Sequence, residues 1–302
     1  MSCFYILLTL FILFILFISM IKIISKRPDG SMFHYAHFLF DCLFSEIIHN
    51  VQNNKIVYRE KNIKQTIGNF CNIYEEVMNV KNIELKNEEF NKINCETLTT
   101  TRFSNPSLNQ INYFRDFIFN RYSITSDILN NEYPEVILIK RGCIEKLVDD
   151  EELNKDLDKL FQSKINGIQR REIIEIDKLE IFLQKKFISF KAVILEYLPF
   201  KEQIQYFKNA KVVIMVHGAA VMNMLFSNKD TLFIEVKPHI SQFPTEKHKQ
   251  QHILTPNLYY NPDYLNNFLK TMNINRIKCE NELDEIIKTI ENSIIKFNKN
   301  IV

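Results

Sequence analysis

Val193–Pro238 reads VILEYLPFKEQIQYFKNAKVVIMVHGAAVMNMLFSNKDTLFIEVKP and holds most of three short apolar runs separated by helical patterns. The runs are of strand length, are rich in Val and Ile, and cover Ala192–Leu195, Val212–Val216 and Leu232–Val236. The order is therefore strand, helix, strand, helix, strand. Near-continuous hydrophobic strands that alternate with helices predict an α/β fold, in which a parallel sheet is covered on both faces.

The motif His217-Gly218-Ala219-Ala220 follows the second of these runs directly and opens the next predicted helix. In open α/β sheets, ligands bind at the carboxyl ends of the strands. Small residues at such an end allow the N–H groups of a helix N-terminus to approach an anion. We therefore expect an anion-binding loop at His217, Gly218 and Ala219.

An ordered set of residues surrounds this loop, namely Glu196, Leu198, Phe200–Ile204, Phe207, Ala210, His217–Ala219, Asn223, Leu225, Phe226 and Glu235. This set resembles the signature of glycosyltransferase family 61, which includes plant xylosyl- and arabinosyltransferases and animal O-linked N-acetylglucosaminyltransferases. Each part falls where a strand, a helix or a turn would place it. One position differs, because the family usually has His-Gly-Ala-Gly and this chain has Ala220. If the loop needs a positive φ at this position, Ala220 is expected to strain it.

The composition limits the classes of protein to consider. A chain of 302 residues is long enough for one large domain or two modest ones. The 38 basic and 36 acidic side chains nearly cancel, and no dense basic block is interleaved with aromatic residues, so nucleic acid is not an expected partner. The 6 cysteines show no CxxC or Cys/His ligand spacing, which argues against a zinc site.

The N-terminus is apolar almost without interruption from Cys3 to Met20, and Ile21, Ile23 and Ile24 extend this run. Its length is sufficient for a helix that spans a bilayer. A cleaved signal peptide is the alternative, but the run is longer than a typical signal core and lacks a basic N-terminal region and a small-x-small cleavage site. We therefore expect an uncleaved transmembrane anchor over residues 1–27, which makes the chain a single-pass membrane protein.

The orientation of this anchor stays open at the level of the sequence. Lys22, Lys26 and Arg27 follow the apolar run, and the positive-inside rule keeps such a flank in the cytosol. The family resemblance implies instead that the domain faces the lumen of the ER or the Golgi.

Two α/β lobes are expected after the anchor. Residues 31–131 predict the first lobe, and residues 132–302 predict a second, Rossmann-like lobe that ends in an amphipathic helix over Asn281–Phe297. Within the second lobe, Ile173–Ile176 is expected to be a further strand. The resemblance implies a two-lobed nucleotide-sugar transferase architecture of the GT-B type, with the acceptor on the first lobe and the nucleotide sugar on the second.

A helix predicted over Phe33–Ile48 is hydrophobic around most of its circumference and should be buried. His37 and Asp41 are four residues apart on one face of it. They resemble the first motif of the family, a His followed by a hydrophobic pair and an acidic residue. Either residue has the chemistry of a general base, and the alternative is that the two simply pair with each other.

Arg141-Gly142 ends another predicted strand, Glu135–Lys140, and resembles the family's strand that ends in Arg. A guanidinium at the carboxyl end of a strand can bind a diphosphate through two hydrogen bonds. The alternative is a surface arginine. The resemblance to the family is weaker just after this motif, because the family often has Arg and Asn where this chain has Lys146 and Asp149.

The resemblance implies an inverting glycosyltransferase that uses a UDP-sugar, of the xylose or N-acetylglucosamine type, and a hydroxyl group of a glycan or glycoprotein acceptor. Arg141, Gly142 and the N–H groups of Gly218 and Ala219 would bind the diphosphate without a metal or other cofactor. His217 would donate a hydrogen bond to a phosphate or to the departing oxygen. Glu235 would accept hydrogen bonds from the ribose hydroxyls, and Asn223 would bind the donor or hold the loop.

Two alternatives to an active glycosyltransferase are considered. The first is a catalytically inactive relative that binds a glycan or a protein. The second is a different α/β enzyme whose loop binds the phosphate of a small metabolite. Besides the donor and the acceptor, the lipid bilayer is the expected partner, through the N-terminal run.

Overall fold

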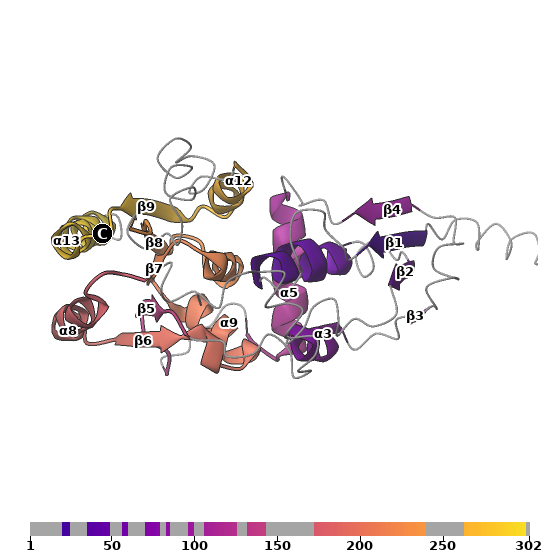
Figure 1. The fold of residues 1–302 in the computed structure, drawn as a ribbon, viewed down its shortest axis with the longest axis horizontal. Helices are drawn as coiled ribbons and strands as arrows, with labels where there is room; N and C mark the ends of the chain where they lie inside the picture. The colour runs from indigo at the N-terminus through magenta and orange to yellow at the C-terminus, as the bar shows by residue number, and fades with distance from the viewer. Residues whose placement is uncertain are drawn as a thin grey trace, which may run out of the picture. The chain divides into compact units, whose positions relative to one another are not determined.

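The computed structural model describes residues 20–24, 35–48, 56–59, 70–78, 83–84, 96–99, 106–125, 132–142, 172–239 and 263–299. The chain divides into two compact units, Met1–Phe103 with Asn112–Ile118, and Ser104–Ile111 with Phe119–Val302. Helix α5 (Leu108–Arg121) contributes residues to both units. The predicted lobe limits, residues 31–131 and 132–302, stay predictions. Figure 1 labels the elements of each unit.

The second unit contains a sheet of 5 parallel strands in the order β6-β5-β7-β8-β9. The strands are β5 (Val136–Lys140), β6 (Phe190–Ile194), β7 (Val212–Val216), β8 (Leu232–Val236) and β9 (Asn275–Cys279). In chain order this arrangement reads second, first, third, fourth, fifth, which is a common order of doubly wound α/β sheets. The predicted parallel sheet is confirmed, and β5 to β8 lie on the apolar runs predicted as strands.

Alternate residues of these strands face opposite sides of the sheet. Leu138, Ile214 and Ile234 belong to a buried cluster that also contains residues of α8 (Ile176–Lys186) and α13 (Leu283–Lys299). Figure 1 shows α8 and α13 on one side of this sheet and α9 (Phe200–Asn209) on the other. The helix α9 packs against η5 (Ala219–Phe226), a 3-10 helix that follows the His217 loop.

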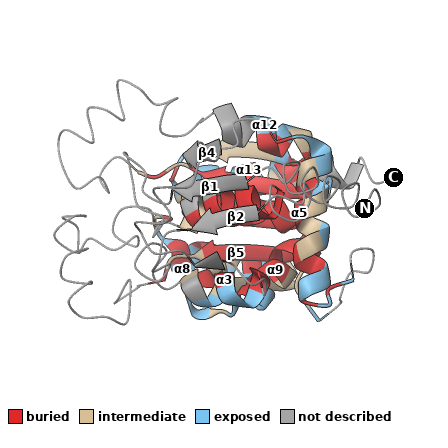
Figure 2. Cartoon of the chain, turned by 90° about the vertical axis from the view of Figure 1, so that its right-hand side faces the viewer, coloured by how far each residue is buried: buried red, intermediate tan, exposed pale blue. Residues whose placement is uncertain are grey.

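The burial pattern follows from this layering. In Figure 2, β5 is buried for almost its whole length, whereas α8 and α9 combine buried and exposed residues. The helix predicted over Asn281–Phe297 is confirmed as α13, in which Ile286 and Ile290 are fully buried.

The first unit contains a second parallel sheet, with 4 strands in the order β3-β2-β1-β4. Its strands are β1 (Met20–Ile24), β2 (Ile56–Arg59), β3 (Ile83–Glu84) and β4 (Glu96–Thr99). The helical segment 35–48 lies between β1 and β2 in the chain, and α3 (Cys71–Met78) lies between β2 and β3. This strand order matches the first part of the Rossmann arrangement.

Strand β1 corrects part of the anchor prediction. Met20–Ile24 was assigned to the end of a membrane helix, but it pairs with both β2 and β4. An apolar Ile-rich run suits a doubly covered parallel strand as well as a helix, and periodicity alone does not separate the two. Residues 1–19 of the predicted anchor lie outside the described residues. Among the residues that the structure describes, no helix has the length and apolar character needed to cross a membrane.

The buried helix predicted near the start of the chain is confirmed over residues 35–48. It winds as the π-helix η1 over His37–Phe44, and Phe38, Leu39 and Phe44 are fully buried. Tyr74 of α3 donates a hydrogen bond of 3.0 Å to Oε1 of the buried Glu46. The side chains of His37 and Asp41 lie outside what the structure describes.

The strand predicted over Ile173–Ile176 is wrong. Residues 172–175 turn into α8, which begins at Ile176, and Glu175 adopts a positive φ of 56°. The side chain of Asn281 binds this turn in place of a neighbouring strand, because it accepts a hydrogen bond from the Ile174 N–H (2.8 Å) and donates one to the Glu172 carbonyl (2.7 Å). The apolar run therefore buries Ile173 without joining the sheet.

Candidate functional site

Arg141 and His217 each follow the carboxyl end of a strand of the second sheet, β5 and β7. Strand β5 lies between β6 and β7. The connection after β5 leads to β6 on one side, and the connection after β6 leads to β7 on the other side. Such a reversal marks the ligand-binding crevice of doubly wound sheets. In the parallel register Ile139 pairs with Met215, so Arg141 and His217 each lie two residues beyond the last pair that joins β5 and β7. The two predicted binding positions thus sit on the two strands that flank the reversal.

The His217 loop presents main-chain donors at this edge. The His217 N–H donates to the Val236 carbonyl (2.9 Å), and the first bond of η5 runs from the Val221 N–H to the Gly218 carbonyl (3.1 Å). The N–H groups of Ala219 and Ala220 therefore precede the first helical bond of η5. Residues 217–220 are all partly exposed. The accessible end of η5 therefore lies where the sequence predicts an anion-binding loop, and the binding of an anion there stays a prediction.

Ala220 does not strain this loop. The non-glycine residues with positive φ in the described parts of the chain are Ser123, Glu175, Asp230 and Asn273. Gly218 itself is extended, with φ 172°. The strain considered for an alanine at position 220 is therefore absent in this conformation.

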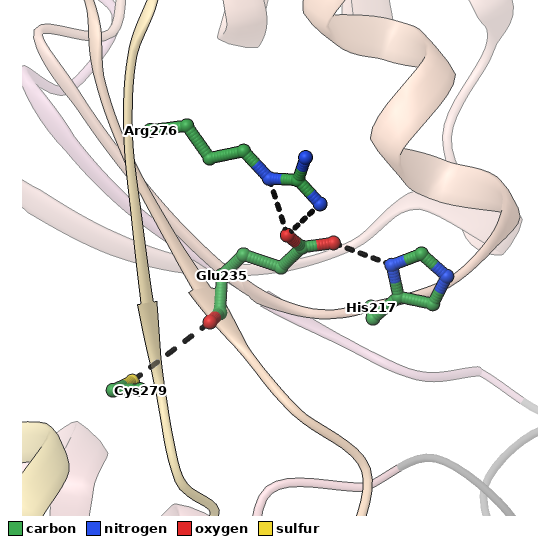
Figure 3. A network of polar contacts seen from close by, with 4 residues as sticks. All are labelled: His217, Glu235, Arg276 and Cys279. Atoms are coloured by element: carbon green, nitrogen blue, oxygen red, sulfur yellow. Dashed lines mark hydrogen bonds and ion pairs between the residues drawn. The ribbon is translucent and has the colours of Figure 1, made fainter. Parts of the chain in front are cut away.

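The ring of His217 is held by a buried carboxylate. Figure 3 shows that Glu235 of β8 lies between His217 and Arg276 of β9. Its Oε1 contacts Nδ1 of His217, and its Oε2 accepts a hydrogen bond from Nε of Arg276 and forms an ion pair with Nη2 of the same residue. The side chain of Glu235 is 2% exposed, that of Arg276 10% and that of His217 12%. The cluster is therefore shielded from solvent on the Glu235 side.

Two neighbours keep this carboxylate ionised. Burial on its own raises the pKa of Glu235, but the hydrogen bond and charge of His217 and those of Arg276 outweigh it, so the pKa lies below its ordinary value. An ionised carboxylate only accepts hydrogen bonds, so Nδ1 of His217 must carry the shared hydrogen.

The end of β5 is shaped by a close contact. Lys140 is bound by α8, through Glu180 at 2.9 Å and Asp177 at 3.2 Å. Arg141 follows it and is partly exposed. A Cβ atom on Gly142 would lie 2.8 Å from Cγ2 of Ile194 and 3.0 Å from Cβ of Glu196. The glycine thus allows the chain to leave β5 against the end of β6.

The other predicted site residues have different surroundings. Asn223 is fully buried in η5, whereas residues 217–220 of the loop are partly exposed. Both oxygens of Glu235 bind protein groups rather than facing solvent. The roles of Asn223 and Glu235 toward a donor stay predictions, as do those of His37 and Asp41.

Part of the sequence signature has a structural explanation. Gln203 of α9 is buried, and its side-chain amide donates to the carbonyls of Leu195 (3.1 Å) and Leu198 (3.0 Å). These bonds hold the turn that connects β6 to α9. This residue therefore supports the frame of the site rather than its chemistry.

Arg276 was not identified from the sequence. Its strand reads NRIKC and has neither a continuous apolar run nor a strict alternation, so no periodic signal marks it. In the same strand, burial is the main cause that lowers the pKa of Lys278, followed by the charge of Arg276. Burial raises the pKa of Cys279 to about 12, so this thiol stays protonated and is not a nucleophile. Among the residues that the structure describes, no three or more His, Cys, Asp or Glu side chains group to hold a metal ion.

Comparison with known proteins identifies the family. No curated protein matches the chain. The family model described as Glycosyltransferase 61 matches residues 35–234, which are 200 of the 302 residues. The match begins at the buried helix of the first unit and ends one residue before Glu235. The matched range therefore confirms the resemblance seen in the sequence, and the chain belongs to the glycosyltransferase 61 family.

Proposed function

We propose that this family member is an inverting glycosyltransferase that transfers a sugar from a UDP-sugar, of the xylose or N-acetylglucosamine type, to a hydroxyl of a glycan or glycoprotein. The observation that carries the proposal is the Glu235-bound His217 at the end of β7, beside the first N–H groups of η5 and on the strand next to β5, which leads to Arg141. Family membership supports glycosyl transfer as the general activity. The donor, the acceptor and a membrane anchor formed by the apolar N-terminal run belong to the proposal.

The site residues act on the departing nucleotide. Arg141 neutralises the diphosphate, and the N–H groups of Ala219 and Ala220 bind its oxygens. His217 donates from Nε2 to a phosphate oxygen while its Nδ1–H is held by Glu235, so the ring acts in its doubly protonated form. A preorganised donor of this kind lowers the barrier by roughly 3–4 kcal/mol. Positive charge and N–H groups then take the place of a metal ion.

The acceptor side requires a base. The acceptor oxygen forms a bond to the anomeric carbon as the bond from that carbon to the diphosphate breaks, and the hydroxyl proton passes to the base. We assign this role to His37 or Asp41 of the first unit, in a two-lobed arrangement of the GT-B type. The parallel sheet of each unit supports such an arrangement.

A thermal-shift titration tests donor binding. Protein is titrated with UDP, GDP, CMP and inorganic phosphate, and His217→Ala is the paired variant. Ligand at a hundred times its dissociation constant adds about 2.7 kcal/mol to the free energy of unfolding. A rise in melting temperature with UDP, reduced in the variant, is expected. A response to inorganic phosphate without one to UDP would instead indicate an enzyme of phosphorylated metabolites.

Turnover tests the chemistry. His217→Ala is expected to abolish transfer from UDP-sugars, and Arg141→Ala is expected to weaken UDP binding. Lys211→Ala is the matched control, because this lysine pairs with Glu135 at the amino ends of the strands and should leave binding unchanged. Full activity of His217→Ala would remove the central assignment. UDP binding without any turnover would favour an inactive, glycan- or protein-binding relative.

A further inference from the structure

We propose that Arg276 is a positioning residue for His217, which it reaches through the carboxylate of Glu235. The catalytic consequence of this arrangement rests on the proposed function, but the coupling between the three side chains does not. Glu235 and Arg276 both lie beyond the matched residues 35–234, so the family match does not supply this link.

The guanidinium holds the carboxylate from one side. Nε of Arg276 donates a hydrogen bond to Oε2 of Glu235, Nη2 forms an ion pair with the same oxygen, and Oε1 is left to contact Nδ1 of His217 (Figure 3). Two contacts from one planar group restrict the motion of the carboxylate more than a single contact does. Because Oε1 is then fixed in direction, the plane of the His217 ring is fixed as well.

The register of the edge strand explains how Arg276 reaches this position. Arg276 pairs with Phe233, and Lys278 pairs with Glu235. Residues that pair across parallel strands, and those two apart along a strand, share a face of the sheet. Arg276 therefore lies on the face of Glu235, and its long side chain extends diagonally toward the carboxyl edge, as Figure 3 shows.

Arg276 and His217 compete for one negative charge. A protonated His217 ring is stabilised by Glu235, and the charge of Arg276 offsets part of this stabilisation. Beside the cluster, the charges that act on Lys278 and Cys279 of β9 include those of Lys237, Glu280 and Glu285. Lys237 is paired with Glu280, and Cys279 stays a neutral thiol. Removal of Arg276 should therefore favour the protonated ring, and removal of the Glu235 charge should disfavour it.

Imidazole NMR measures this coupling without an activity assay. Two-bond ¹H–¹⁵N spectra distinguish the protonated ring and its two neutral tautomers, and His217→Gln assigns one signal set among the 7 histidines. Wild type is expected to titrate to the Nδ1–H tautomer. Relative to wild type, the titration midpoint should rise by about one pH unit in Arg276→Met and fall by a similar amount in Glu235→Gln.

A conservative variant separates charge from geometry. Arg276→Lys keeps the positive charge but loses the planar group that contacts Oε2 of Glu235 through two nitrogens. The titration midpoint of His217 should therefore stay near that of wild type while the NMR signals of its ring broaden. Thermal melts confirm that each variant is folded. An unchanged midpoint and tautomer in folded Arg276→Met would overturn the proposal.

The activity arm distinguishes the two proposals. If UDP-sugar transfer is detected, Arg276→Met should lower kcat more than it changes KM, and it should have no further effect in the Glu235→Gln background. If wild type transfers no sugar but the NMR shifts occur as expected, the proposed function fails while the positioning role of Arg276 stands.

Discussion

Strands β8 and β9 are hydrogen-bonded neighbours in one sheet, yet they differ in almost every other respect. The sequence LFIEV of β8 is buried throughout, whereas in NRIKC of β9 only Cys279 is buried. Strand β8 is central and contains one charged residue, Glu235. Strand β9 is an edge strand and supplies the cation that binds it. The comparison shows that burial defines a central strand, whereas an edge strand is free to carry the polar residues that complete a site.

The largest effect is expected when a core isoleucine of β8 and its partner in β9 are replaced and compared. Ile234 and Ile277 pair in register, but Ile234 is fully buried and Ile277 only partly. Ile234→Ala should lower the free energy of unfolding by roughly 2–5 kcal/mol, because it leaves a cavity between packed layers. Ile277→Ala should cost less than half as much. Urea denaturation of both variants measures the difference, and equal losses would contradict the contrast between centre and edge.

The second prediction concerns the buried charge of β8. The pKa of Glu235 in the folded protein lies below its ordinary value of 4.5, so its ionised form stabilises the fold above that pH. The stabilisation is lost as the pH falls through the lowered pKa. At pH 7, Glu235→Gln should therefore be about 1.5–3 kcal/mol less stable than wild type. The difference in stability between wild type and Glu235→Gln should shrink in melts performed at pH values progressively further below 4.5. A gap that is constant with pH would show that the charge is not stabilising.

A third prediction tests the opposite edge of the sheet, where central β5 ends against β6. Gly142→Ala should lower stability by roughly 1–3 kcal/mol, because its Cβ would meet Ile194 at 2.8 Å. The Gly142→Ala/Ile194→Ala double variant should lose less than the sum of the single losses, since Ile194→Ala removes the closest atom. Strictly additive losses in chemical denaturation would mean that this contact is not the cause.

The smallest effect is expected at the amino ends of the central strands. Glu135 pairs with Lys211 at 2.6 Å, but the two side chains are 53% and 48% exposed. Glu135→Gln should change the free energy of unfolding by at most about 1 kcal/mol, because solvent screens an exposed pair. It is the matched control for Glu235→Gln, with the same substitution. An effect as large as that at Glu235 would show that burial does not determine how much these carboxylates contribute to stability.

The central strands could be read from the sequence because each is a continuous apolar run. Strands β7 and β8 lie at the predicted residues, and α9 lies between β6 and β7, where a helix is predicted. Strand β1 was misread as membrane helix because an apolar run satisfies both environments. The run at Ile173 was misread as a strand because the side chain of Asn281, distant in sequence, binds its backbone instead.

The candidate site divides in the same way. His217, Gly218 and Arg141 were predicted as site residues because a short motif directly follows a strand, and the parallel sheet places the ends of both strands at one edge. Arg276 left no local mark, since a polar edge strand resembles a loop in its composition. Glu235 was identified from the motif, but not that its carboxylate binds His217.

Local sequence was thus enough to establish the α/β class, the order of the buried strands along the chain and the loop that carries His217. These features depend on hydrophobic runs and on the residues next to them. Tertiary structure alone joined β9 to β8 and so brought Arg276 to Glu235. Their contact spans 41 positions along the chain. It depends on the register of neighbouring strands, which no residue pattern within either segment encodes.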